Sequence, residues 1–351
     1  MTRTTVVSGG IFALVVAGGV LHFLAAPPVS TFVVTGISLG GVAWTIGVAT
    51  ESVGARYGPA VTGALQSTLG NLPELFIVLF ALAAGELVVA RFAILGSLFA
   101  NALLVLGLAV AVGALRAPSG IMRFEPRLPN DTATLLLLAV FIIALLGASD
   151  LAGDAASDNQ LAISIVGAVL LLAVYGAWLF AYLRAEVKGE RALEEPSHTV
   201  LPFGLAVGLL AGSGIAAAFV SDWFVEAIDP AVEELGISKA FTGLVIVAIA
   251  GNAVENVVAV QLAAKQKYDL AVSVVKNSVV QIACFLWPVL ILASLLFTQQ
   301  LTFVVAPVFV GALVLMAIAV WQITGDGEAT FFEGAALVAL YLVLATIVWF
   351  E

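Results

Sequence analysis

Eleven apolar runs dominate the sequence and limit the folds that are open to it. Each run has about 20 residues, which is the length that an α-helix needs to cross roughly 30 Å of hydrocarbon. We place them at residues 7–26, 30–50, 59–83, 88–114, 131–149, 161–183, 200–220, 238–263, 270–295, 302–322 and 331–350. Only 10% of the residues are charged, and the mean hydropathy is +1.16. The sequence therefore predicts an all-α integral membrane protein with about eleven transmembrane helices.

Basic residues are divided unequally between the two sets of alternating loops. One set holds ten of the thirteen, namely Arg3, Arg56, Arg116, Arg123, Arg127, Arg184, Lys188, Arg191, Lys265 and Lys267. The other set holds Arg91 and Lys239, and Lys276 lies within the ninth run. Because basic loops remain in the cytoplasm, we expect a cytoplasmic N-terminus and an outer C-terminus. The expected location is a prokaryotic cell membrane.

The loops that this orientation places outside are acidic after the fifth and seventh runs. Their carboxylates belong to Asp150, Asp154, Asp158, Asp229, Glu233 and Glu234. Each one alone is ordinary for a solvated loop, but together they would concentrate cations at the outer mouth. The first run follows Arg3 and ends in "LAAPP", which also resembles a cleaved signal peptide. The charge pattern is satisfied with this segment retained, so we expect a helix there.

A shift of 181 residues superimposes polar residues of the two halves of the chain. It pairs Gly70 with Gly251, Asn71 with Asn252, Glu74 with Glu255, and Ser97 with Ser278. We predict four parts: an N-terminal helix at 1–28, a five-helix repeat at 29–183, a cytoplasmic linker at 184–199 and a second repeat at 200–351. With five spans in each repeat, the second is inverted relative to the first. Inverted repeats with matching polar interruptions are typical of secondary transporters that bind their substrate between the repeats.

The motif Gly-Asn-x-x-Glu occurs once in each repeat, at residues 70–74 and 251–255. Gly is flexible, Asn competes for backbone hydrogen bonds and Pro73 has no N–H, so the helices should loosen and free carbonyl oxygens. The glycines alone would also allow close helix packing. Carboxylates in hydrocarbon are costly, and those that remain there are usually functional. Glu74 and Glu255, with the two Asn side chains, form an all-oxygen set that suits Ca²⁺.

Soft or borderline metals have few candidate ligands in this chain. Its nitrogen and sulfur ligands are limited to His22, His198 and Cys284, which lie in different parts of the sequence. Two facing glutamates repel each other when both are charged, which favours protonation of at least one. The same pair therefore binds either a divalent cation or protons. This competition is the physical basis of cation/proton antiport.

The residues around both motifs resemble the Ca²⁺/H⁺ antiporter (CAX) family of the cation/Ca²⁺ exchanger superfamily. The family motifs read G-N-x-x-E-L and G-N-A-x-E-H, each followed by an apolar stretch, a charged turn and a helix with G-S. Here they read "GNLPELFIVLFALAAGELVVARFAILGSLFANALLVLG" and "GNAVENVVAVQLAAKQKYDLAVSVVKNSVVQIACFLWPVLIL". The ending "GDGEATFFEGAALVALYLVLA" is similar to the last loop and helix of the family. The resemblance covers both halves.

The resemblance implies an eleven-helix antiporter that exchanges Ca²⁺ for H⁺ by alternating access. It implies that Glu74 and Glu255 are the cation ligands, assisted by Asn71 and Asn252 beside Gly70 and Gly251. Glu51 in "ATES" and Asp222 in "VSDW" match acidic positions of the family, and either relay protons, guide the cation or merely end a span. Further polar residues beside the site, expected to support the ligands, are Ser97, Asn101, Ser278, Gln281, Asn256 and Lys276. No cofactor is expected besides Ca²⁺ as the substrate.

Three departures from the family leave alternatives open. Asn256 replaces a histidine and removes a group that titrates near neutral pH, so proton coupling would differ. Lys276 either extends to the cytoplasmic surface or faces a glutamate as a built-in counter-ion, which would make the chain a non-transporting member. Pro73 before Glu74 resembles the Pro-Glu of sodium/calcium exchangers, which keeps Na⁺ coupling open.

Functions from other classes fit the sequence less well. An intramembrane protease would need a ligand cluster such as H-E-x-x-H or a partnered nucleophile, and neither occurs within the apolar runs, so we expect a transporter and not an enzyme. A channel would use similar oxygen ligands, but buried charge in two inverted halves fits alternating access better. The expected partners are Ca²⁺, H⁺ and the lipid bilayer, with no nucleic acid. The sequence leaves the oligomeric state open.

Overall fold

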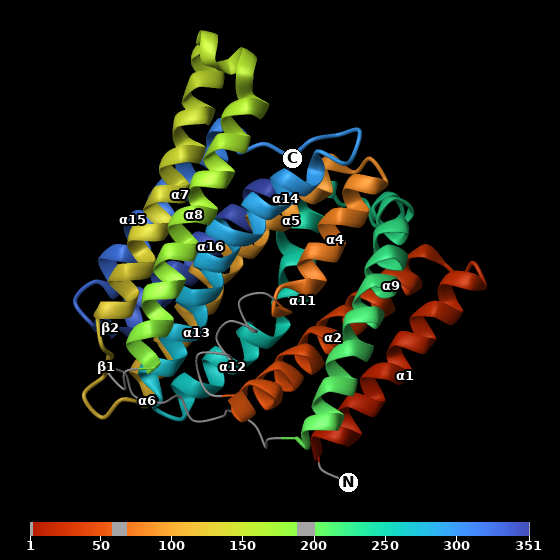
Figure 1. Ribbon diagram of the computed structural model, residues 1–351, viewed down its shortest axis with the longest axis horizontal. Helices are drawn as coiled ribbons and strands as arrows, with labels where there is room; N and C mark the ends of the chain where they lie inside the picture. The colour runs from red at the N-terminus through yellow and green to blue at the C-terminus, as the bar shows by residue number, and fades with distance from the viewer. Residues whose placement is uncertain (1–2, 58–68, 188–200, 351) are drawn as a thin grey trace. The chain divides into compact units, whose positions relative to one another are not determined.

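A computed structural model describes residues 3–57, 69–187 and 201–350, most of which are helical (Figure 1). The α-helices are α1 (Arg3–Phe23), α2 (Pro28–Tyr57), α4 (Leu72–Ala83), α5 (Leu87–Phe99), α6 (Leu106–Arg116), α7 (Arg127–Ala152), α8 (Gln160–Val187), α9 (Phe203–Leu235), α10 (Lys239–Phe241), α11 (Ala248–Gly251), α12 (Ala253–Ala264), α13 (Tyr268–Gln281), α14 (Trp287–Ser294), α15 (Pro307–Thr324) and α16 (Phe331–Trp349). The remaining elements are the π-helical turns η1 (Ala100–Val105), η3 (Thr242–Val247) and η4 (Ile282–Leu286), the 3₁₀-helix η2 (Ala155–Asn159), and the strands β1 (Ile121–Arg123) and β2 (Glu328–Thr330).

The helices confirm the predicted all-α membrane fold. Within the described residues, nine helical stretches are long and apolar enough to cross a membrane. The stretch that is broken at Asn252, between α11 and α12, becomes a tenth if it is counted as one span. Helix α4 has only 12 residues, and the predicted run at 59–83 begins outside the described residues. The predicted count of eleven is therefore not confirmed.

Helix α9 is longer than the run from which it was predicted. It continues past residue 220, passes through Pro230 and ends at Leu235, followed by Gly236, whose φ of 65° is left-handed. Asp229, Glu233 and Glu234 therefore lie in the helix, and their prediction as loop residues was wrong. A count of apolar residues stops where charges begin, whereas a helix continues wherever its backbone hydrogen bonds are made.

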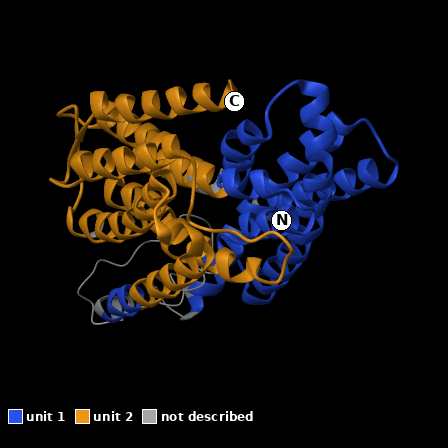
Figure 2. Ribbon diagram, turned by 90° about the horizontal axis from the view of Figure 1, so that it is seen from above, with its two compact units in different colours: residues 1–93, 177–254, 351 blue, residues 94–176, 255–350 orange. Residues whose placement is uncertain are grey.

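The chain forms two compact units, each made of two separate stretches of sequence (Figure 2). The first unit contains residues 1–93 and 177–254, together with residue 351. The second unit contains residues 94–176 and 255–350. Each unit thus combines parts of both predicted repeats, because the chain crosses between units within α5, within α8 and near the start of α12.

In the first unit, α2 packs along α9 in the antiparallel direction. Near the start of α2, the Phe32 ring stacks on Phe224 of α9 with centroids 4.9 Å apart. Near its end, the Ser52 hydroxyl accepts a hydrogen bond of 3.2 Å from the Leu201 amide, just before α9. Helices α1 and α4 also pack against α9. Helix α9 is therefore the common support for the helices of this unit.

In the second unit, α16 packs on α6 and α15 packs on α7. Gly107 and Gly334 allow the first pair to approach closely, because a Cβ on Gly107 would lie 2.7 Å from the Gly334 carbonyl oxygen. Strands β1 and β2 join antiparallel, with Met122 opposite Ala329. They tie the end of α6 to the start of α16.

The shift of 181 residues that pairs the motifs also relates the helix bounds. It carries residues 72–83 of α4 onto residues 253–264, which are the bounds of α12. It carries the first residues of α5 and α6 onto those of α13 and α14. The turn η1 falls within one residue of η4. Corresponding segments of the two halves therefore adopt the same secondary structure, including a π-helical turn, which often marks a functional site.

Candidate functional site

Both Gly-Asn-x-x-Glu motifs have a backbone turn at the asparagine, as the sequence predicts. In the first motif, Gly70 and Asn71 form a turn before α4, and Pro73 lies in the first helical turn. In the second, α11 ends at Gly251 and α12 begins after Asn252. The backbone angles of the two asparagines nearly coincide, with φ −93° and ψ 17° at Asn71 and φ −98° and ψ 22° at Asn252.

Glu74 lies in the first turn of α4 and is only 5% exposed. The free N–H groups and the dipole at a helix N-terminus stabilise a carboxylate there. Asn71, directly before the helix, is also buried. The first motif thus places a buried carboxylate where the end of a helix reduces the cost of its charge.

Gly251 of the second motif lies directly against Glu74 of the first. A Cβ on Gly251 would lie 2.8 Å from Glu74 Cγ and 3.4 Å from Oε1. The next residue, Asn252, is buried, and its Nδ2 donates a hydrogen bond of 2.9 Å to the Ala248 carbonyl. All three residues belong to the first unit. The structure therefore brings the predicted glutamate of one motif to the predicted glycine and asparagine of the other.

Glu255 occupies the third position of α12, as Glu74 occupies the third position of α4. Its side chain lies outside what the structure describes, so the predicted pairing of the two glutamates stays a prediction. Among the described side chains, no three His, Cys, Asp or Glu residues gather into a metal site.

The structure does not bring the two predicted relay residues together. Glu51 directly precedes Ser52, at the end of α2 that meets Leu201. Asp222 lies two residues before Phe224, at the opposite end of the α2–α9 pair. Both side chains are half-buried. They lie near opposite ends of α2 and do not form one cluster.

The predicted supporting residues lie in the second unit. Ser97 of α5 and Asn101 of η1 are buried, and η1 packs against α13. Helix α13 carries Ser278, which is also buried, and ends at Gln281. Asn256 of α12 is half-buried. The structure thus places α13, which carries Ser278 and Gln281, beside the π-helical turn that carries Asn101.

Of the two alternatives for Lys276, the structure contradicts extension to the cytoplasmic surface. Its side chain is 2% exposed, and its Nζ lies 3.3 Å from Thr324 Oγ1 at the end of α15. The Thr324 hydroxyl donates to the Val320 carbonyl at 2.7 Å, so its oxygen accepts from the lysine. Among the side chains that the structure describes, no carboxylate lies within 4.0 Å of Nζ. The surrounding helices enclose the aliphatic part of the Lys276 side chain, so its amino group does not reach water.

We expect Lys276→Met to leave the fold and the transport activity intact. A buried amine whose described partner is one hydroxyl contributes little stability, and an apolar side chain of similar length fills the same space. The Tm of the purified variant in detergent should equal or exceed that of the wild type. Calorimetric titration with Ca²⁺ provides the second readout. Tight Ca²⁺ binding by the variant alone would identify Lys276 as a tethered cation that blocks transport.

One charged cluster was missed from the sequence. Lys239, the first residue of α10, holds two carboxylates: its Nζ lies 2.7 Å from Glu86 Oε2 and 2.7 Å from Asp229 Oδ1. Glu86 lies in the turn between α4 and α5, and Asp229 lies on α9. The sequence did contain a sign of this cluster: Lys239 is one of only two basic residues in the loops predicted to lie outside, which are otherwise acidic.

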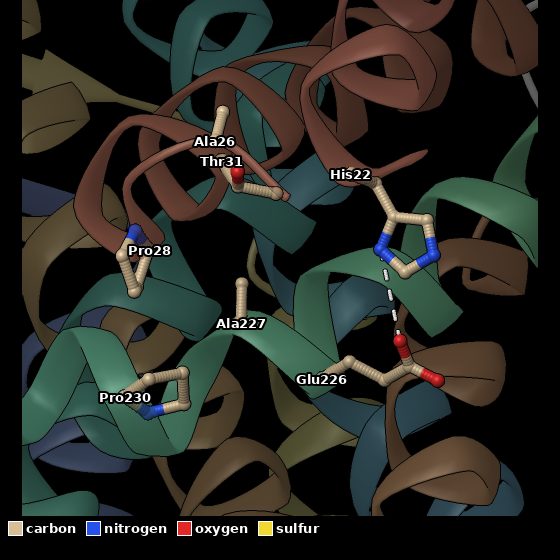
Figure 3. A pocket seen from close by; sticks show the side chains of 7 residues that line it. All are labelled: His22, Ala26, Pro28, Thr31, Glu226, Ala227 and Pro230. Carbon is tan, nitrogen blue, oxygen red and sulfur yellow. Dashed lines mark ion pairs between the residues drawn. The ribbon is translucent and has the colours of Figure 1, made fainter. Parts of the chain in front are cut away.

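A separate pocket lies between α9 and the junction of α1 and α2 (Figure 3). His22 and Glu226 face each other across it, with Nδ1 and Oε2 3.6 Å apart. The remaining lining residues are Ala26, Pro28, Thr31, Ala227 and Pro230. None of these residues belongs to a Gly-Asn-x-x-Glu motif. The pocket is therefore distinct from the candidate cation site.

Comparison with known proteins supports one family throughout the chain. A Ca²⁺/H⁺ antiporter of Aphanothece halophytica is 30% identical over 349 residues, covering 94% of this chain and 92% of the relative. The Ca²⁺/H⁺ antiporter ChaA of Bacillus subtilis (strain 168) is 32% identical over 337 residues, covering 95% and 94%. The structure of native YfkE has a TM-score of 0.81 at 29% identity, covering 97% of this chain and 100% of that chain.

More distant structures share the fold alone. A crystal structure of the H⁺/Ca²⁺ exchanger CAX has a TM-score of 0.78 at 15% identity, covering 98% of this chain and 89% of that chain.

Residues 5–184 and 205–350 match the family described as sodium/calcium exchanger protein. Both motifs and both halves lie within the matched residues. The chain belongs to the sodium/calcium exchanger protein family.

Proposed function

We propose that this protein exchanges Ca²⁺ for H⁺ across a membrane by alternating access. The observation that carries the proposal is the buried Glu74 carboxylate at the start of α4, in contact with Gly251 of the second motif. A buried carboxylate at a broken helix is a site for a hard cation. Two relatives that align over most of the chain are named Ca²⁺/H⁺ antiporters, which supports the same substrates.

Glu74 and Glu255 are the proposed ligands of Ca²⁺, with Asn71 and Asn252 as further oxygen donors. Each carboxylate must lose its proton before it can hold the cation, and protonation of the pair releases the cation again. One group of oxygens therefore serves both substrates in turn. Glu51 and Asp222, at opposite ends of the α2–α9 pair, would carry ions toward the site from its two sides. Their separation suits this role better than direct ligation.

Two inverted five-helix repeats are the proposed basis of alternating access. The support is the shift of 181 residues, which relates α4 to α12 and η1 to η4 as well as the motifs themselves. Equivalent elements in opposite orientation allow one site to face either side of the membrane. From the distribution of basic residues, we further propose a cytoplasmic N-terminus and an outer C-terminus.

Exchange of Na⁺ for Ca²⁺ is the second candidate. It is favoured by Pro73 directly before Glu74, the Pro-Glu pair that sodium/calcium exchangers also carry. The sodium-calcium exchanger NCX_Mj has a related fold, with a TM-score of 0.56 at 20% identity. At this identity the likeness supports the fold and not the transported ions.

Calcium uptake into proteoliposomes separates these candidates. Purified protein is reconstituted, and Ca²⁺ uptake is followed under an imposed pH gradient with no Na⁺, or under an imposed Na⁺ gradient at equal pH. We expect the pH gradient to drive uptake and Na⁺ to be dispensable. If only the Na⁺ gradient drives uptake, the function is Na⁺/Ca²⁺ exchange and not Ca²⁺/H⁺ exchange. Absence of uptake under both gradients would contradict a transport function.

A further inference from the structure

Lys239 joins three segments of the first unit through its two carboxylate partners. Its Nζ lies 2.7 Å from Glu86 Oε2, and 2.7 and 2.8 Å from the two oxygens of Asp229. Glu86 is only 20% exposed, whereas Lys239 and Asp229 are 36% and 51% exposed, so the contact with Glu86 is the better shielded of the two. A basic residue at the start of a helix opposes the helix dipole. The position of Lys239 is thus explained by its carboxylate partners and not by the stability of α10.

The stretch that Lys239 begins touches both helices that Glu86 connects. Gly243 of η3 meets α5, because a Cβ there would lie 2.7 Å from Phe92 Cβ. At the far end of the stretch, Gly251 meets Glu74 at the start of α4. Twelve residues separate Lys239 from Gly251, and twelve separate Glu74 from Glu86.

The ion pair and the candidate site therefore lie at opposite ends of the same two segments, residues 239–251 and residues 74–86. A shift of the Lys239 stretch along α4 would move Gly251 and Asn252 past Glu74 by the same amount. The contact between Gly251 and Glu74 is a van der Waals contact. It limits how closely the two residues approach, but it does not fix the position of Gly251 along α4. The charged contact at the other end supplies that restraint, because both carboxylates converge on one ammonium.

We propose that Lys239 is a positioning residue for the cation site, which holds Gly251 and Asn252 in register with Glu74. The proposal rests on the proposed Ca²⁺/H⁺ exchange. Loss of the ammonium would leave the ligands present but poorly aligned. The consequence is weaker Ca²⁺ binding, with little change in the maximal rate once the site is filled.

Calcium uptake kinetics of Lys239→Gln test this role. The initial uptake rate under an imposed pH gradient is measured against Ca²⁺ concentration in proteoliposomes. We expect the KM for Ca²⁺ to rise about fivefold or more, with the maximal rate reduced less than about twofold. Lys239→Arg keeps a cation that can hold both carboxylates, and should restore most of the affinity. Glu86→Gln should raise the KM in the same direction.

A matched control removes an ion pair of ordinary surface type. Arg123 pairs with Glu328 at 2.9 Å, and both side chains are about half exposed or more, at 60% and 49%. Exposed pairs of this kind contribute roughly 0–1 kcal/mol, so Arg123→Gln should leave the KM unchanged. The Tm of each variant is recorded in parallel.

The possible results are distinguishable. If Lys239→Gln lowers the Tm but leaves the KM unchanged, or if Lys239→Arg fails to restore affinity, the positioning role is overturned while the exchange function stands. If the wild type shows no uptake under a pH gradient, the exchange function itself is overturned, and the positioning role with it. A raised KM that Lys239→Arg restores, with Arg123→Gln unaffected, supports both.

Discussion

Glu74→Gln is expected to abolish Ca²⁺/H⁺ exchange while the folded protein still accumulates in the membrane. The substitution keeps the shape of the side chain but removes its negative charge and its ability to release a proton. Loss of a charge that faces a divalent cation costs at least ~3 kcal/mol at an effective dielectric constant near 20, or about 100-fold in affinity. Glu255→Gln should have an equally large effect if the two motifs act as a pair.

The measurement is Ca²⁺ uptake in proteoliposomes, with the Tm of each purified variant as the check on folding. Glu328→Gln serves as the control, because this exposed carboxylate lies on β2 and pairs with Arg123. It should transport like the wild type. A buried carboxylate costs free energy whenever it is ionised, so the neutral variant of Glu74 should be as stable as the wild type or more so. Near wild-type uptake by Glu74→Gln would remove the central role of this residue.

Gly251→Ala is expected to reduce exchange strongly through steric contact alone. A Cβ at this position would lie 2.8 Å from Glu74 Cγ, closer than real Cβ atoms approach another heavy atom, so the carboxylate must move. The backbone of Gly251 is helical and accepts alanine without strain. A displacement approaching 1 Å at a binding group can cost up to about 100-fold in rate, and we expect at least a tenfold loss.

Gly208→Ala is the matched control for this prediction. Gly208 lies in α9 of the same unit, and a Cβ there would meet nothing within 4 Å. Both substitutions add one methyl group to a helical glycine, so the comparison separates the steric contact from the general effect of alanine on a helix. Full activity in Gly208→Ala with reduced activity in Gly251→Ala would locate the effect at Glu74. Equal activity in the two variants would argue against a fixed contact between the motifs.

The apolar runs and the two motifs were the most informative parts of the sequence. The runs predicted the membrane fold because hydrocarbon imposes both a length and a composition on each helix. The residues Gly70, Pro73 and Asn252 predicted the helix interruptions, because their chemistry disfavours continuous backbone hydrogen bonding. The contact of Glu74 with Gly251 followed from the expectation that the two motifs meet.

Features set by three-dimensional packing could not be predicted. The sequence places Lys276 about six residues into an apolar run, within reach of water for a long side chain, but helix packing encloses the side chain and its Nζ contacts Thr324. Lys239 meets Glu86, which is 153 residues away in sequence, and only the packing of α10 beside the α4–α5 turn makes that pair. The extension of α9 to Leu235 was missed because charged residues interrupt the apolar run but not the helix.

The most direct test of the account is proton movement driven by a Ca²⁺ gradient. Proteoliposomes with a trapped pH indicator and no initial pH gradient receive external Ca²⁺, with the membrane potential clamped and Na⁺ absent. Exchange at shared carboxylates predicts that Ca²⁺ entry expels protons, so the interior becomes alkaline. Vesicles that contain Glu74→Gln should show no such change. Calcium entry into wild-type vesicles without internal alkalinisation would contradict the account.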